Sequence, residues 1–197
     1  MTATDHEPRK LLAREDRRAQ ILGAAAAAFA RTGHASTSMA EVAREAGVTR
    51  VLLYRHFASK EELYRAVLDD TLTLLGEAWE SRDPDNLAAA AVRAHLRAAR
   101  ESPDGYRLLW RHADTEPEFT SHAQQVRDLL VSVADQAVGT DIRPQLRAWA
   151  MSTLVSAIVE ATLAWLDHGR PDDDEAFIEA AATGLVRQVT GWAEVAI

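Results

Sequence analysis

A short stretch near the N-terminus constrains the fold of this 197-residue chain more than any other feature. Ser38 and Glu41 have the spacing of a capping box, in which two side chains satisfy the first free N–H groups of a helix. Gly47 is expected to end this helix, because glycine adopts the left-handed conformation at little steric cost. Thr49 is then placed to cap a second helix that ends near Phe57. The order of helix, glycine turn and short helix predicts a helix-turn-helix.

The sizes of the residues in this stretch fit two helices that cross. Ala43 is small enough for the crossing point. The apolar residues predicted to hold the second helix against the first are Val42, Ala46, Val48 and Leu53. The second helix has about eight residues, so it is roughly 12 Å long at about 1.5 Å per residue. That length suits end-on insertion into the major groove of B-DNA, which is about 12 Å wide.

Polar side chains on and after the second helix have the chemistry that DNA recognition needs. Arg50 can bind O6 and N7 of a guanine with two hydrogen bonds. Lys60 begins the next helix, where backbone N–H groups and the helix dipole also attract phosphate. Tyr54 and His56 either pack the hairpin or contact DNA, and we favour DNA contact. The residues for which we favour packing are Leu53 and Phe57.

Two segments, residues 37–49 and 53–63, resemble the DNA-binding domain of the TetR (tetracycline-repressor) family at many positions with fixed spacing. The resemblance extends over about residues 16–65. It implies a homodimer that binds a palindromic operator in double-stranded DNA, represses transcription and is released by a small-molecule effector. Operator choice is expected to depend on Arg50 and Val51, where the family varies. By position, the resemblance implies DNA contacts from Ser38, Thr49, Arg50, Tyr54, His56 and Lys60.

The distribution of charge agrees with a DNA-binding N-terminal segment. The whole chain has a formal net charge of −8, which is unusual for a protein that binds DNA. Residues 1–60 nevertheless contain ten Lys/Arg and six Asp/Glu, whereas residues 61–197 contain twelve and twenty-four. This asymmetry is expected when only the N-terminal part meets a polyanion, although a basic tail on an acidic protein gives the same pattern.

The rest of the chain has the apolar spacing of helices, and no stretch shows convincing strand alternation. Apolar residues recur in steps of three and four from Tyr64 to Trp79, for example. We therefore predict an all-α protein of about nine helices. The predicted parts are a flexible basic arm (residues 1–13), a helix-turn-helix DNA-binding domain (residues 14–62) and a ligand-binding and dimerisation domain (residues 63–197).

The last two predicted helices are more apolar than a monomer requires. Residues 148–166 contain a single formal charge, Glu160, so more than one face of that helix is apolar. A second copy that forms a four-helix interface would cover the excess, and burial inside the monomer is the alternative. The candidate interface residues are Trp149, Leu154, Ile158, Trp165, Leu185, Val189 and Trp192.

The resemblance also implies a small-molecule site between the central helices, at about residues 65–165. Ligand pockets are mostly apolar with a few polar anchors. The candidate pocket residues are Trp79, Tyr106, Trp110, His112, Phe119, His122, Met151 and Glu160. Taken singly, each of the first seven is favoured as a core residue over a ligand contact. Glu160 is expected either to anchor a cationic ligand or to face water.

The sequence favours a cytoplasmic protein without a membrane span. The chain has no cysteine, which excludes disulfides and thiolate chemistry and agrees with a reducing compartment. Residues 21–30 are apolar, but charged residues and a glycine lie too close on both sides for an export signal. Glu160 and several hydroxyl side chains argue against a membrane span at residues 148–166.

An enzyme is the main rival class. The sequence contains no phosphate loop, nucleotide-binding glycine pattern or nucleophile motif, so we predict no catalytic residue, no cofactor and no metal site. A loose polar cluster matches no usual metal-ligand spacing; its members are His112, Asp114, Glu116 and His122. A metal-dependent enzyme and a helical protein-interaction module, both without DNA function, stay open as alternatives.

Overall fold

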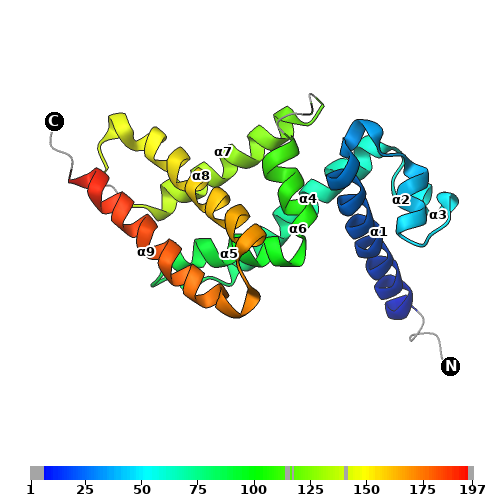
Figure 1. The fold of residues 1–197 in the computed structure, drawn as a ribbon, viewed down its shortest axis with the longest axis horizontal. Coiled ribbons are helices and arrows are strands. Elements are labelled where there is room, and N and C mark those ends of the chain that lie inside the picture. The colour runs from blue at the N-terminus through cyan, green and yellow to red at the C-terminus, as the bar shows by residue number, and fades with distance from the viewer. Residues whose placement is uncertain (1–6, 114–115, 117, 140–141, 195–197) are drawn as a thin grey trace. The chain divides into compact units, whose positions relative to one another are not determined.

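The computed structural model describes residues 7–113, 116, 118–139 and 142–194, with side chains from residue 14 onward. Every regular element among these residues is a helix, which confirms the predicted all-α class (Figure 1). The α-helices are α1 (Glu7–Ser36), α2 (Met39–Glu45), α3 (Arg50–His56), α4 (Lys60–Glu80), α5 (Leu87–Glu101), α6 (Pro103–Arg107), α7 (Thr120–Ala137), α8 (Pro144–His168) and α9 (Asp174–Ala193). A π-helical turn, η1 (Leu108–His112), follows α6, and a 3-10 turn, η3 (Pro171–Asp173), precedes α9.

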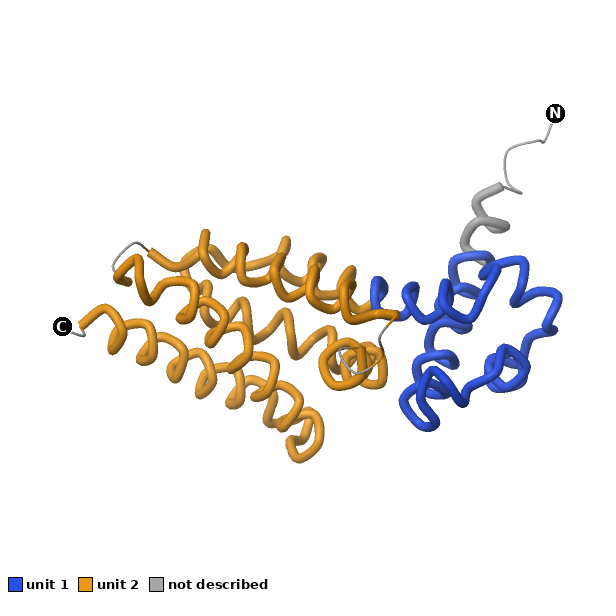
Figure 2. The backbone as a smooth tube through the Cα atoms, turned by 90° about the horizontal axis from the view of Figure 1, so that it is seen from above, with its two compact units in different colours: residues 1–70 blue, residues 71–197 orange. Residues whose placement is uncertain are grey.

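The chain divides into two compact units, residues 1–70 and residues 71–197 (Figure 2). The division lies within α4, whereas our predicted domains meet between residues 62 and 63. The first turns of α4 belong to the first unit because Tyr64 is fully buried there, with its ring centroid 5.0 Å from that of Phe29 in α1. A division at the start of α4 would separate these two rings.

The first helix begins earlier than we predicted. It starts at Glu7, so residues 7–13 of the predicted arm are helical, whereas residues 1–6 lie outside the described residues. Pro8 is compatible with this start because the first turn of a helix needs no N–H from that position. The predicted stop is confirmed, since Gly33 has φ 78° and ψ 160°, a conformation that interrupts the helix and favours glycine.

The second unit is a helical bundle in which α5 packs against α8 and α9, and α7 packs against α8. The residues of its buried core include Val92, Leu96, Ala150, Met151, Leu154, Ile178 and Leu185. Three of the helices are joined at the start of α9, where Arg100 and Asp174 form an ion pair of 2.7 Å. The indole Nε1 of Trp165 donates a further hydrogen bond of 2.7 Å to the Asp174 carboxylate. One carboxylate therefore fixes α5, α8 and α9 together.

Helix α8 retains apolar surface that the monomer does not cover. It is the one helix of the described residues with the length and composition to cross a membrane, which is weak evidence for a span. Here it packs against α5, α7 and α9 as a bundle helix. Only 39% of its most apolar stretch is buried inside the chain. Much of the apolar surface that the sequence predicts for this helix is therefore open.

Candidate DNA interface and ligand cavity

Ser38 begins α2 with the capping box that the sequence predicts. Its Oγ accepts a hydrogen bond of 3.2 Å from the Glu41 N–H, and the Glu41 carboxylate accepts one of 2.9 Å from the Ser38 N–H. The Ser38 hydroxyl also donates a hydrogen bond of 2.9 Å to this carboxylate, and the bonds from the Ser38 N–H and hydroxyl, in that order, hold the pKa of Glu41 below its ordinary value. The helix thus begins at a fixed residue, and it buries Val42 and Ala43 in the first unit.

Gly47 forms the turn between α2 and α3 in a left-handed conformation, with φ 61°. The N–H of Val48 donates a hydrogen bond of 2.9 Å to the Ala43 carbonyl oxygen, which closes the end of α2. Thr49 then caps α3, because its Oγ1 accepts a hydrogen bond of 3.2 Å from the Leu52 N–H. The predicted arrangement of helix, glycine turn and short helix is confirmed.

Helix α3 has one buried side and one exposed side. Leu53 and Phe57 are buried, as we predicted for the residues that pack. Tyr54 is 52% exposed and Val51 is 72% exposed, and Arg50 is exposed beside them. These side chains have the accessibility that contact with base edges requires, and the contacts themselves stay predictions.

Four arginines that we did not single out from the sequence act electrostatically on His56. Burial lowers the pKa of His56, and the positive charges of Arg14 and Arg18 lower it further, followed by those of Arg17 and Arg55. Arg17 and Arg18 follow Arg14 by three and four residues in α1, a spacing that places these three arginines on one face of the helix. This periodic signal was available in the sequence. Because clustered arginines attract phosphate, they extend the candidate interface beyond α3.

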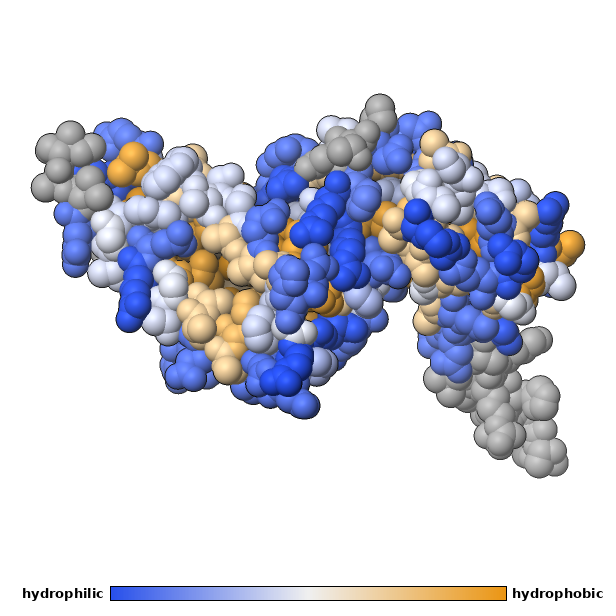
Figure 3. Space-filling view, in the orientation of Figure 1, coloured by the Kyte–Doolittle hydropathy of each residue, from blue (hydrophilic) through white to orange (hydrophobic). Residues whose placement is uncertain are grey.

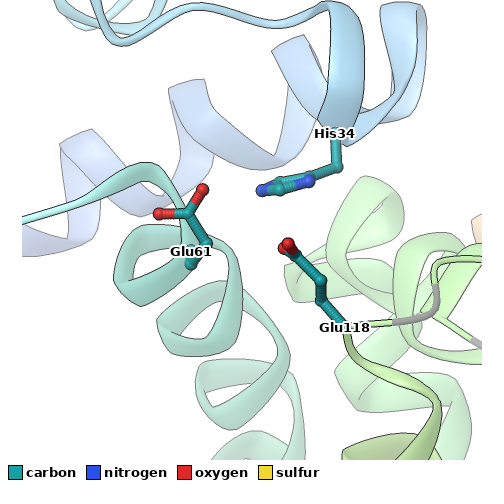
Figure 4. Close-up of side chains that lie close together, drawn as sticks. All are labelled: His34, Glu61 and Glu118. Carbon is teal, nitrogen blue, oxygen red and sulfur yellow. The ribbon is translucent and has the colours of Figure 1, made fainter.

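Lys60, a predicted phosphate contact, makes a contact inside the chain. Its Nζ donates a hydrogen bond of 2.7 Å to the carbonyl oxygen of His34 and one of 3.3 Å to that of Ala35. These carbonyls lie in the last residues of α1, after the interruption at Gly33, where partly negative backbone oxygens attract a cation. The His34 ring also lies beside Glu61, the next residue of α4 (Figure 4). Lys60 therefore joins the start of α4 to the end of α1, and its contact with phosphate stays a prediction.

The second unit contains a cavity of about 540 Å³ with walls from α4, α5, α7, α8 and α9. Its lining is aliphatic and aromatic apart from the polar side chains of His95 and Thr190, and no lining residue carries a formal charge. Leu129 and Val186 belong to the lining and are more than half exposed, so the cavity opens to the surface there. A cavity of this size and apolar character is typical of small-molecule sites.

Of the eight residues predicted for a ligand pocket, Trp79 lines this cavity. The others do not belong to its lining and lie elsewhere: Tyr106, Trp110, Phe119 and Met151 are buried, His122 is partly buried, and His112 and Glu160 are exposed. The exposed position of Glu160 agrees with the alternative that it faces water. Ligand contact by these seven residues stays a prediction.

His95 in α5 is a buried polar residue of the cavity that we missed. It is 6% exposed, and its Nδ1 lies 2.8 Å from the hydroxyl oxygen of Tyr106, which is fully buried. Burial lowers the pKa of His95 to about 4 and raises the pKa of Tyr106. Both groups are therefore neutral at pH 7. The sequence signal that could have identified His95 is its position one turn after Val92 on the apolar side of α5, because a single polar residue there needs a partner.

The residues predicted for a dimer interface fall into two groups. Those that line the cavity of the monomer are Leu154, Ile158, Leu185 and Val189. The others are tryptophans: Trp149 is 53% exposed, and its ring centroid lies 5.0 Å from that of Trp192. Trp165 stacks on Phe177 with centroids 4.8 Å apart. The Trp149–Trp192 pair thus contributes apolar surface on α8 and α9.

The polar cluster that we considered for a metal-dependent enzyme falls partly outside the described residues, because Asp114 is not among them. Its other members, His112, Glu116 and His122, form no group within the described part of the chain whose ligand atoms lie close enough to hold a metal ion.

Comparison with known proteins agrees with this geometry. Residues 21–67 match the family described as bacterial regulatory proteins, tetR family. The chain is 30% identical over 176 residues to the HTH-type transcriptional activator FasR of Mycolicibacterium smegmatis, covering 85% of this chain and 80% of that protein. It is 40% identical over 94 residues to the HTH-type transcriptional repressor Rv3405c of Mycobacterium tuberculosis, covering 47% of this chain and 50% of the relative. Among solved structures, a TetR-like transcriptional regulator from Rhodococcus sp. RHA1 superposes with a TM-score of 0.73 at 23% identity, covering 91% of this chain and 97% of the other.

Proposed function

The chain belongs to the tetR family of bacterial regulatory proteins, and we propose that it regulates transcription by inserting α3 into the major groove of an operator. The observation that carries this proposal is the division of α3 into two sides. Leu53 anchors the helix in the core, while Arg50 and Tyr54 are exposed on it. Arg50 has the chemistry for guanine, and the arginines of α1 have the charge for the phosphates beside it. The enzyme alternative has no support in this family.

We propose that two copies pair through α8 and α9. Figure 3 shows apolar residues at the surface over these helices, and Trp149 and Val186 are both more than half exposed. Two helices from each copy would form a four-helix interface and remove this surface from water. A symmetric dimer carries two copies of α3 and reads two half-sites about 34–36 Å apart, which makes a palindrome the expected operator.

We propose that a small molecule in the cavity changes the affinity for DNA through α4. The middle of this helix contributes Leu72, Leu75 and Trp79 to the cavity wall, and its first residue, Lys60, holds the end of α1. A ligand that fits one position of α4 better than another shifts the population of DNA-binding conformers. Coupling of this kind requires different ligand affinities in the two states.

We propose repression as the mode of regulation and the cytoplasm as its location. A dimer bound across a promoter excludes polymerase without needing a further contact. The comparisons include a protein named as an activator and one named as a repressor, so the sign of regulation needs its own test. A transcription assay with purified polymerase and the selected operator is expected to show less transcript, and more transcript would reverse this assignment.

The test of DNA recognition is selection of binding sites from random duplex DNA by the full chain. A palindromic site is expected, and its enrichment should be lost in Tyr54→Ala and Arg50→Ala. Arg97→Ala is the matched control, because Arg97 is an exposed arginine of α5 in the second unit. Failure to bind any DNA at low salt would overturn the proposal. DNA affinity that does not depend on Tyr54 or Arg50 would favour the protein-interaction module.

A further inference from the structure

The cavity in the second unit has a chemistry that selects among ligands. None of its lining residues is charged at pH 7, because burial keeps His95 neutral, so a charged group placed inside would lose its hydration without gaining a counter-charge. Most of the wall consists of Leu, Val, Ile and Ala side chains, which favour an apolar body of matching size. The ligand that fits is therefore uncharged over the part that enters the cavity.

One polar side chain of this wall, His95, is buried and held in place by a hydrogen bond. His95 is almost completely buried, and its Nδ1 is engaged with the Tyr106 hydroxyl at 2.8 Å. Burial keeps both groups neutral, so this hydrogen bond joins an uncharged phenol and an uncharged imidazole. A neutral imidazole nitrogen is a better hydrogen-bond acceptor than a phenol oxygen, and we therefore assign the shared proton to Tyr106. That assignment leaves the other proton of the ring on Nε2 of His95.

We infer that the cavity binds a neutral, mainly apolar small molecule that carries one hydrogen-bond acceptor, such as a ketone or ester carbonyl, and that Nε2 of His95 donates to this acceptor. Tyr106 is a positioning residue in this inference, since it fixes the tautomer of His95. The identification of the cavity as the effector site rests on the proposed function, whereas the chemistry of the ligand rests on the cavity wall.

The test uses three probes with similar chains, decan-2-one, decanoate and decylammonium, added to the full-length protein. Binding is measured by titration calorimetry and by the fluorescence of tryptophan, because Trp79 lines the cavity. Decan-2-one is expected to bind at least tenfold more tightly than either ion. Equal or tighter binding of an ion would overturn the inference.

Two variants locate the bound ketone. His95→Phe keeps a ring of similar size and removes the donor, so it should weaken decan-2-one binding about three- to tenfold, as expected for the loss of one hydrogen bond. Ala91→Phe places a large side chain on the lining and should abolish binding. If both variants bind the ketone like the natural chain, the site lies elsewhere and the inference fails. Circular dichroism of each variant establishes that it is folded.

The same samples separate this inference from the proposed function. Operator binding is measured by gel shift with and without decan-2-one. Ketone binding that depends on His95 but leaves operator affinity unchanged supports the ligand chemistry and refutes the effector role. Absence of ketone binding, with operator binding intact in a chain that still requires Arg50, refutes the ligand chemistry and leaves DNA recognition standing.

Discussion

The Nζ of Lys60 donates a hydrogen bond of 2.7 Å to the carbonyl oxygen of His34, and this bond joins the first residue of α4 to the end of α1. The residue that we predicted as a phosphate contact is thus also a capping residue for another helix. An ammonium group at a helix C-terminus is stabilising because the last carbonyls are unpaired and the dipole is negative there. Substitution of Lys60 should therefore affect both stability and DNA binding.

Lys60→Met keeps most of the side-chain stem and removes the charge. We expect a loss of about 1 kcal/mol in the free energy of unfolding, measured by urea denaturation. If Lys60 also neutralises a phosphate, the slope of log affinity against log salt should decrease by about one for each phosphate that the variant no longer neutralises. A reduced stability with an unchanged salt slope would assign Lys60 to the fold alone.

Arg50→Ala should change which sequences are bound rather than whether DNA is bound. A bidentate contact with guanine contributes about 1–3 kcal/mol of discrimination, so its removal should relax the preference at one position in each half-site. The measurement is a comparison of the sequences that the natural chain and the variant select from random DNA. An identical preference at every position would exclude direct base reading by Arg50.

Trp149→Glu should convert a dimer to monomers. Trp149 is more than half exposed on α8, so a carboxylate there is tolerated by the monomer but would be buried unpaired in a four-helix interface. Sedimentation equilibrium measures the change in mass. Leu129→Glu is the matched control, because Leu129 is equally exposed on α7, outside the proposed interface. A natural chain that is already monomeric would contradict the proposed pairing.

The helix-turn-helix could be predicted in detail because its signals are local. Ser38, Gly47 and Thr49 each act on backbone groups within three or four residues, so spacing alone indicates which N–H or carbonyl they serve. The buried side of α3 follows in the same way from its apolar spacing, and the structure places Leu53 and Phe57 in the core as expected.

The cavity could not be predicted because it depends on five helices that are distant in sequence. We predicted mainly aromatic residues for the ligand pocket. Tyr106 and Trp110 instead pack in the core, and the cavity wall is formed mainly by aliphatic residues. The position of His95 on the apolar side of α5 indicates that it needs a polar partner, but only tertiary packing identifies Tyr106 as that partner. The boundary between the two units within α4 could not be predicted for the same reason, since the packing of Tyr64 on Phe29 is a tertiary contact.

Gly47→Ala should destabilise the first unit although there is space for the new methyl group. Apart from Gly47 itself and its two chain neighbours, no heavy atom of the described residues lies within 4 Å of the position that its Cβ would occupy, so the effect is confined to the backbone. An alanine with φ near 61° is strained by about 1–2 kcal/mol. Gly23→Ala is the control: Gly23 lies inside α1 with similarly open surroundings, and there alanine should stabilise by about 0.5–1 kcal/mol. Equal effects of the two changes in urea denaturation would contradict the role of Gly47 in the turn.

The buried histidine predicts how stability depends on pH. The pKa of His95 is about 4 in the folded chain because burial disfavours the charged ring, whereas an unfolded histidine has the ordinary value of 6.5. Between these values the unfolded chain takes up a proton that the folded chain does not, so stability falls as the pH decreases from about 6.5 to about 4. The expected loss of stability is about 3 kcal/mol, and it should stop below the lower value, where both states are protonated.

The measurement is urea denaturation at a series of pH values. The His95→Gln variant cannot titrate at this position and should lack this part of the pH dependence. The control is His168→Gln, at an exposed position at the end of α8, and it should retain the pH dependence. A natural chain and a His95→Gln variant with the same slope would show that the folded ring takes up its proton as readily as the unfolded one, which would contradict the lowering of its pKa by burial.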